Sequence, residues 1–148
     1  MHPSPATPPS GSSALQNQEA RVVVESLDGS RVVVSVPGTE YRLHLVPGAP
    51  ASAFPTRPHA RATGSVRGRA LRMHRAAAGG VFIEPIEGHP RILQGRVLEV
   101  DAAGRRLLLH AVIPMWMDLA EGQSAEEFQA GDLVNFYAER GVTFTPTA

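Results

Sequence analysis

The second half of the sequence repeats the order of features in the first half. Three matched pairs lie 75 positions apart: Arg21 and Arg96, Gly29 and Gly104, and Tyr41 and Trp116. The offset falls to 61 at the ends, where residues 80–85 and 141–146 share the pattern Gly-Val-x-x-x-Pro. This shared order of strand, glycine turn, strand and closing motif predicts two copies of one small unit, in which the matched residues are equivalent.

Short runs rich in β-branched and aliphatic residues, separated by turn residues, predict strands in both halves. In the first half they are 21–26, 31–36, 41–46, 64–75 (with a bend near Ala70) and 81–86. In the second half they are 95–100, 105–112, 115–119, and 132–139 paired with 142–145. Asp28-Gly29 in the first turn is a dipeptide that supplies the positive φ of tight hairpins.

One short helical segment is expected between the third and fourth strands of the second half. Ser124 followed by Glu127 three positions later has the spacing of a capping box. We therefore expect a helical turn over residues 124–129.

Five strands with a short helix between the third and fourth is the layout of the OB-fold. The chain resembles two tandem five-stranded OB-like barrels packed together, an all-β protein. The predicted parts are a disordered Pro/Ser-rich tail (1–18), a first barrel with an Arg-rich insertion (19–86), a short linker (87–94) and a second barrel (95–148). A single barrel of six to eight strands, or a β-sandwich, is the alternative fold.

Composition restricts the classes of function. The sequence contains no cysteine, so disulfides, thiolate metal sites and cysteine nucleophiles are excluded. No apolar run approaches the length of a membrane span, and residues 1–20 do not have the pattern of a secretory signal. We expect a cytoplasmic, soluble protein without membrane contact, although a signal peptide removed earlier would leave the same sequence.

Charge is divided unequally between the two halves. Residues 1–83 hold nine Arg against four acidic residues (+5), and residues 84–148 hold five Arg against ten (−5). All 14 basic residues are Arg, which binds phosphate and carboxylate in a fork geometry. A GC-rich genome gives the same bias, and the sequence leaves both explanations open.

A basic stretch in the first half is the main candidate site. No acidic residue lies between Glu40 and Glu84. The predicted nucleic-acid-binding residues are Arg57, Arg61, Arg67, Arg69, Arg72 and Arg75, with Tyr41 as an aromatic platform. Such a basic stretch beside a barrel is typical of proteins that track a phosphate backbone, while aromatic side chains stack on bases. The alternative is that these arginines are solvated or pair with acidic groups of the second unit.

A second candidate lies around Trp116. The segment from His110 through Ile113-Pro114 to Met115-Trp116-Met117 is similar to a motif of small periplasmic copper-binding OB proteins of the copper-efflux chaperone type. The resemblance implies Cu(I) ligation by His110, Met115 and Met117, with Trp116 near the ion. The spacer after His110 is shorter than in that family, and Trp116 lies between the two Met residues. The alternative is that the Met residues fill the core.

No catalytic motif or phosphate-binding glycine loop is present, so we predict a non-enzymatic binding module without a cofactor. Single-stranded nucleic acid at the Arg-rich face is the first hypothesis. Protein–protein assembly through charge-complementary repeats is the second, and copper(I) binding the third. A homo-oligomer is compatible with all three.

Overall fold

The aliphatic runs of the sequence form strands in a computed structural model that describes residues 18–147. The first half contains β1 (Ala20–Leu27), β2 (Val32–Ser35), β3 (Arg42–Pro47), β4 (Ala60–Arg69), β5 (His74–Arg75), β6 (Phe82–Glu84) and β7 (Glu87–Gly88). The second half contains β8 (Ile92–Asp101), β9 (Arg106–Ala111), β10 (Ile113–Asp118), β11 (Leu133–Tyr137) and β12 (Thr143–Pro146). Two short 3-10 helices are η1 (Ala51–Ala53) and η2 (Ala125–Glu127). The protein is therefore all-β, as predicted.

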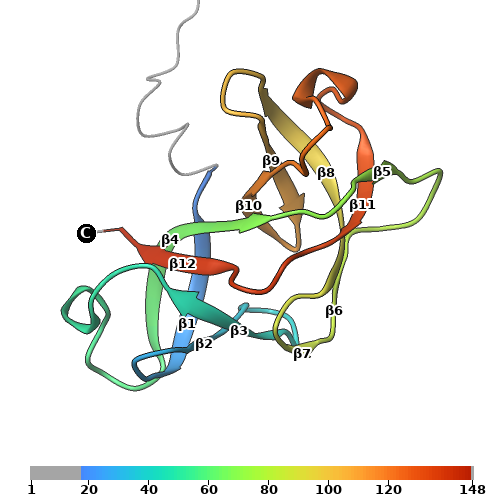
Figure 1. The fold of residues 1–148 in the computed structure, drawn as a ribbon. Coiled ribbons are helices and arrows are strands. Elements are labelled where there is room, and N and C mark those ends of the chain that lie inside the picture. Colours follow the sequence, from blue (N-terminus) through green and yellow to red (C-terminus); the bar gives the residue numbers. More distant parts are fainter. Residues whose placement is uncertain (1–17, 148) are drawn as a thin grey trace, which may run out of the picture.

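Five of these strands form a closed barrel. Their order is β1-β2-β3-β12-β4, and β4 pairs back onto β1 (Figure 1). Four of the five pairings are antiparallel, while β3 and β12 run parallel. Closure leaves the barrel without a free edge along these pairings, which removes a common route to aggregation.

The strand that closes this barrel comes from the C-terminal end of the chain. The prediction that residues 81–86 close the first barrel, and that residues 142–145 pair with 132–139, is wrong. Instead, β12 lies between β3 and β4, and β6 pairs with β8. Two glycines explain the fit of β12. A Cβ atom on Gly64 would lie 2.8 Å from the Phe144 ring, and one on Gly48 would lie 2.0 Å from the Thr145 hydroxyl oxygen.

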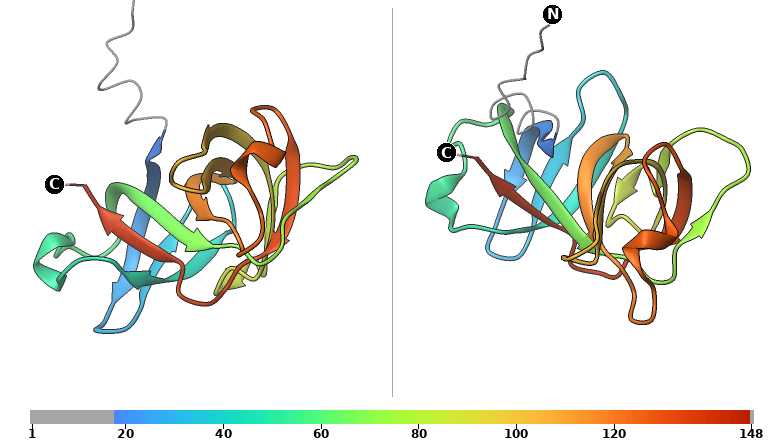
Figure 2. Two further views of the ribbon diagram at one scale, coloured as in Figure 1. Left: turned by 45° about the horizontal axis from the view of Figure 1, so that its top comes forward. Right: turned by 90° about the horizontal axis from the view of Figure 1, so that it is seen from above.

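A second series of pairings joins the remaining strands. It runs β10-β9-β8-β11, and β10 pairs in parallel with Arg67–Arg69 at the end of β4. The chain then leaves the strand at Ala70, which forms an isolated antiparallel bridge with Ala138 just after β11. The bend predicted near Ala70 falls at this point. β4 is thus shared: its first part belongs to the barrel and its last part to the second group of strands (Figure 2).

Both long hairpins carry an irregularity at a comparable point. The register shifts after Val24–Val34 in the β1/β2 pair and after Val97–Leu109 in the β8/β9 pair. Val24 and Val97 are 73 positions apart, whereas Arg21 and Arg96 are 75 positions apart, so the two hairpins do not follow one constant offset. In each turn an aspartate accepts backbone hydrogen bonds, Asp28 from Ser30 and Arg31, and Asp101 from Gly104. Gly29 does not adopt a positive φ, because the Asp28 side chain holds the turn instead.

One continuous core runs through both groups of strands. Trp116 is buried, and Tyr41 is partly buried against the core. The expected helical turn is confirmed as η2, where Ser124 and Glu127 form the complete capping box. Buried Gln123 bonds both the backbone N–H and the carbonyl of Met73, so the segment after β4 is fixed to the second half.

The predicted tail, residues 1–18, lies outside the described residues except for Gln18. Within residues 18–147, no helix has both the length and the apolar character that a membrane crossing requires.

Candidate anion-binding groove

Three arginines of the predicted site contact acidic residues of the second half. Arg67 Nη2 donates to Asp118 Oδ1 at 2.9 Å. Arg69 Nε lies 3.9 Å from Glu139 Oε2, and Arg75 Nε donates to Asp132 Oδ2 at 3.3 Å. Arg75 also donates to the Glu127 carbonyl and lies 5.4 Å from the centre of the Phe128 ring. At these three positions the basic stretch connects the two halves of the molecule.

The other three predicted arginines, Arg57, Arg61 and Arg72, are exposed. Arg57 lies beside Phe54 and Glu25 in a depression of about 450 Å³. Arg72 follows the end of β4, after exposed Leu71. Within residues 18–147, none of the three lies within 4.0 Å of a carboxylate oxygen.

Arg61 shares a groove with an arginine that the sequence prediction did not include. The register of β1 and β4 pairs Arg21 with Thr63 and Val23 with Arg61, so Arg21 and Arg61 project diagonally from one face. Two adjoining depressions, of about 420 and 470 Å³, share Arg21, Arg61 and Pro37. We call them together the Arg21/Arg61 groove.

One wall of the groove has an unusual backbone. The second depression reaches the turn between β9 and β10, at Val112, Ile113 and Pro114. Val112 is the single residue between β9 and β10, and its two neighbours, Ala111 and Ile113, are paired with each other. The φ of Val112 is 69°. A β-branched residue in this region of φ is an outlier that costs about 1–3 kcal/mol, and such residues gather at binding sites. The strained turn therefore adds apolar residues to the lining that Arg21 and Arg61 share.

The groove has a net positive charge. Glu19 is the one acidic residue that lines it, against Arg21 and Arg61. The Glu19 carboxylate accepts a hydrogen bond from the Thr147 hydroxyl, so it already has a partner. Two arginine forks next to a threonine hydroxyl and an apolar wall suit an anion that carries a flat apolar body.

Aromatic platforms are scarce near the basic residues. Tyr41 is partly buried, and its hydroxyl accepts a hydrogen bond from the Ile83 N–H at 3.3 Å. Phe54 is buried, and Trp116 is covered by the Arg106 guanidinium at 4.0 Å from the ring centre. Asp101 holds Arg106 in this position at 2.8 Å. The structure therefore does not bring Tyr41 to the predicted arginines as a free stacking surface.

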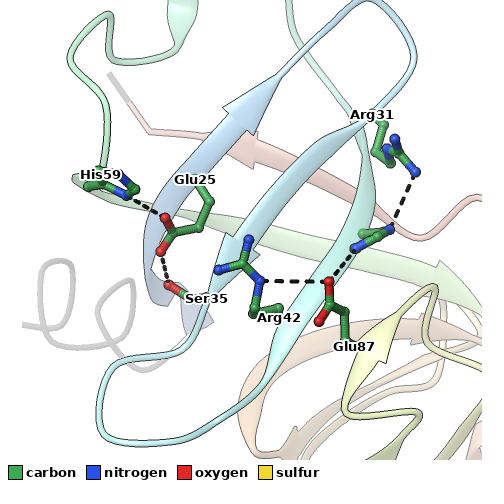
Figure 3. A network of polar contacts seen from close by, with 7 residues as sticks. Glu25, Arg31, Ser35, Arg42, His59 and Glu87 are labelled. Carbon is green, nitrogen blue, oxygen red and sulfur yellow. Dashed lines mark hydrogen bonds and ion pairs between the residues drawn. The ribbon is translucent and has the colours of Figure 1, made fainter.

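A polar network covers the neighbouring face of the barrel (Figure 3). Glu25 accepts a hydrogen bond from Ser35 at 2.6 Å and lies 2.5 Å from His59 Nδ1. These two hydrogen bonds, Ser35 first, hold the pKa of Glu25 below its ordinary value. Serine, glutamate and histidine are the residues of a catalytic triad, but here the carboxylate lies between the hydroxyl and the imidazole. His59 does not contact Ser35 in a way that would activate it.

The same face continues to His44 on β3. Arg31 lies 3.5 Å from His44 Nδ1, and Glu87 lies 3.9 Å from His44 Nε2 and 3.8 Å from Arg42 (Figure 3). Burial is the main cause that lowers the pKa of His44, and the charges of Arg31 and His89 act in the same direction. Glu87 raises this pKa but does not outweigh them, so the imidazole is mostly neutral at pH 7.

The residues of the copper hypothesis are separated in the structure. Met115 and Met117 are buried in the core, whereas His110 is exposed and pairs with Pro114 on the opposite face of the β9/β10 hairpin. The two thioethers therefore point away from the imidazole. Across residues 18–147, no three His, Asp or Glu side chains are grouped in a way that could hold a metal ion.

Comparison with known proteins gives no assignment: no family model matches the chain, and no curated protein or solved structure gives a significant match.

Arg21, Thr63, Pro37 and Val112 line the groove but are absent from the predicted site. The alternation of β1 contained a signal for Arg21, because Arg21 and Val23 share an outward face while Val22 and Val24 point inward. The sequence contained no signal for Val112, because its positive φ depends on the pairing of β9 with β10 on either side of it.

Proposed function

We propose that the protein is a non-enzymatic module that binds single-stranded nucleic acid along the Arg21/Arg61 groove. The observation that carries the proposal is the pair of exposed arginines on one face of β1 and β4, which line the same depression as a strained apolar turn. Within residues 18–147, neither side chain forms an ion pair, in contrast to Arg67, Arg69 and Arg75. Phosphate oxygens would occupy the arginine forks, and a base would lie against Pro37 and Pro114.

The strand order supports an OB-type reading of the barrel. The strand order in the sheet is β1-β2-β3-β12-β4, and β3 and β12 run parallel. This order makes a five-stranded Greek-key barrel in which β12 is the fifth strand. We further propose that β8, β9, β10 and β11 form a second copy of the unit, with Arg67–Ala70 as its fifth strand. In this arrangement each copy supplies the last strand of the other.

The groove lacks the exposed aromatic side chains with which many single-strand binders stack bases. We therefore expect weak binding with little sequence preference, dominated by phosphate contacts. Such binding falls steeply as salt rises, because each neutralised phosphate releases condensed counterions.

Fluorescence anisotropy with labelled oligo-dT and oligo-U tests the proposal. Wild-type protein should bind at low salt and lose affinity between about 50 and 200 mM salt. Arg21→Glu/Arg61→Glu should abolish binding without lowering the melting temperature. The matched control is Arg72→Glu/Arg140→Glu, which makes the same charge change at two exposed positions outside the groove. Equal loss in both variants, or no wild-type binding at micromolar protein, contradicts the proposal.

A further inference from the structure

An exposed apolar row lies away from the groove, on β8, on β11 and on the segment that follows β4. Tyr137 of β11 pairs with Ile92 of β8, and the Leu71 N–H donates to the Tyr137 carbonyl at 2.8 Å. Tyr137 and Ile92 are opposed residues of neighbouring strands, so their side chains point to the same side. Leu71 extends this row through its backbone hydrogen bond to Tyr137. Tyr137 is 53% exposed and Leu71 is 47% exposed, while Ile92 is half-buried. In Figure 1, β8 and β11, which carry Ile92 and Tyr137, run side by side.

A depression adjoins the row. Its volume is about 350 Å³, and Glu84, Pro85, Arg91 and Ile92 line it. Glu84 of β6 pairs with Ile92, which itself pairs with Tyr137. Across β11, β8 and β6, the exposed Tyr137 ring therefore lies at one end of the paired residues, and the depression lined by Glu84 and Ile92 lies at the other. Tyrosine and arginine side chains are enriched among the residues that dominate binding at protein interfaces.

The charges around the row are of both signs. Glu84 and Glu139 lie beside Arg91 and Arg69, and Arg69 already contacts Glu139 at 3.9 Å. Two carboxylates disfavour a nucleic-acid backbone at this face. The surface has an exposed tyrosine ring, a depression and charges of both signs, so it can be complementary to a second copy of itself. An interface around a two-fold axis requires such self-complementarity.

We propose that a second copy of this chain docks on this face, with Tyr137 of each copy in the depression formed by Glu84, Pro85, Arg91 and Ile92 of the other. Pro85 and Ile92 contact the ring, and the carboxylate of Glu84 accepts a hydrogen bond from the tyrosine hydroxyl. The interaction is independent of the Arg21/Arg61 groove.

Sedimentation velocity on the full-length protein tests the dimer without any nucleic acid. The sedimentation coefficient of the wild type should rise with concentration towards that of a dimer. Tyr137→Glu and Leu71→Glu should each weaken association at least about tenfold. The matched control is Leu98→Glu. Leu98 is an aliphatic residue of β8 that is 42% exposed, similar to Leu71, but it lies outside the row.

Circular dichroism of each variant verifies folding, and two separate variants in the row protect the test against a failure of one to fold. A wild type that stays monomeric at every concentration overturns the proposal. Dimerisation that neither Tyr137→Glu nor Leu71→Glu weakens, or that Leu98→Glu weakens equally, also overturns it.

Discussion

The two ends of β4 carry similar arginines in different surroundings. At the first end, Arg61 faces β1 and lies in an open groove with Arg21. At the second end, Arg67 and Arg69 lie beside β10 and the segment after β11, where Asp118 and Glu139 neutralise them. The same residue type thus serves as a free cation at one end and as a contact between the two halves at the other. Neighbouring strands decide which role each arginine has.

The largest expected effect is a difference in unfolding free energy between alanine variants at Gly64 and Gly68, the two glycines of β4. A Cβ on Gly64 would lie 2.3 Å from the Thr145 carbonyl oxygen, a backbone atom that cannot move without displacing β12. We expect Gly64→Ala to lower the free energy of unfolding by about 3 kcal/mol. Gly68 meets only the side-chain ends of Met117 and Val142 at 3.0 Å, so Gly68→Ala should change it by no more than about 1 kcal/mol. Urea unfolding of both variants measures the difference, and equal losses would contradict the role of β12.

The next prediction compares single arginines at the two ends. Arg61→Gln should weaken oligonucleotide binding about tenfold and reduce the slope of log affinity against log salt by about 1, because one phosphate contact is lost. Arg67→Gln should leave both quantities unchanged, since its guanidinium already binds Asp118. Anisotropy titrations over a salt series provide the measurement. A larger loss for Arg67→Gln would reverse the assignment.

A smaller effect is expected on stability when the paired arginines are removed. The Arg67 and Arg69 side chains are 51% and 55% exposed, so solvent screens both ion pairs. Arg67→Gln/Arg69→Gln should cost about 0.2–1 kcal/mol per pair. Arg21→Gln/Arg61→Gln should leave the melting temperature unchanged, and it therefore serves as the matched control in differential scanning calorimetry. A lower melting temperature for the control would show that the groove arginines are structural.

The smallest effect concerns His44 in the network beside the groove. Its pKa in the folded state is below the ordinary value of 6.5, so the unfolded chain takes up a proton before the folded protein does. Stability from neutral His44 is present above about pH 6.5 and is lost as the pH falls below it. His44→Gln should flatten the dependence of unfolding free energy on pH between about 7.5 and 5.5. An unchanged slope would show that His44 titrates equally in both states.

Local patterns predicted the individual strands well. Short aliphatic runs mark β1, β2, β3, β8 and β9, and the Ser124–Glu127 spacing identifies η2, because these features depend on neighbours in the sequence. The partners of β6 and β12 were predicted incorrectly. Their Gly-Val-x-x-x-Pro motifs are alike, whereas the choice of partner depends on Gly48 and Gly64, which are distant in sequence.

The candidate site was predicted only in part. Arg57, Arg61 and Arg72 are exposed as expected, but sequence proximity also grouped them with Arg67, Arg69 and Arg75. The acidic partners of these three are at least 50 positions away and come close only through the pairing of β4 with β10 and β11 with β5. Division of net charge between the halves indicated such contacts without identifying them.

The position of β12 has a consequence for synthesis of the chain on the ribosome. The first four barrel strands are complete at Arg69, but the fifth ends at Pro146, 77 residues later (146 − 69). At translation rates of roughly 5–20 residues per second, the seam between β3 and β4 stays open for about 4 to 15 seconds. During this interval both strands expose unpaired edges, which are sites of misassociation. The nascent barrel therefore exposes these two edges until its last strand has been synthesised.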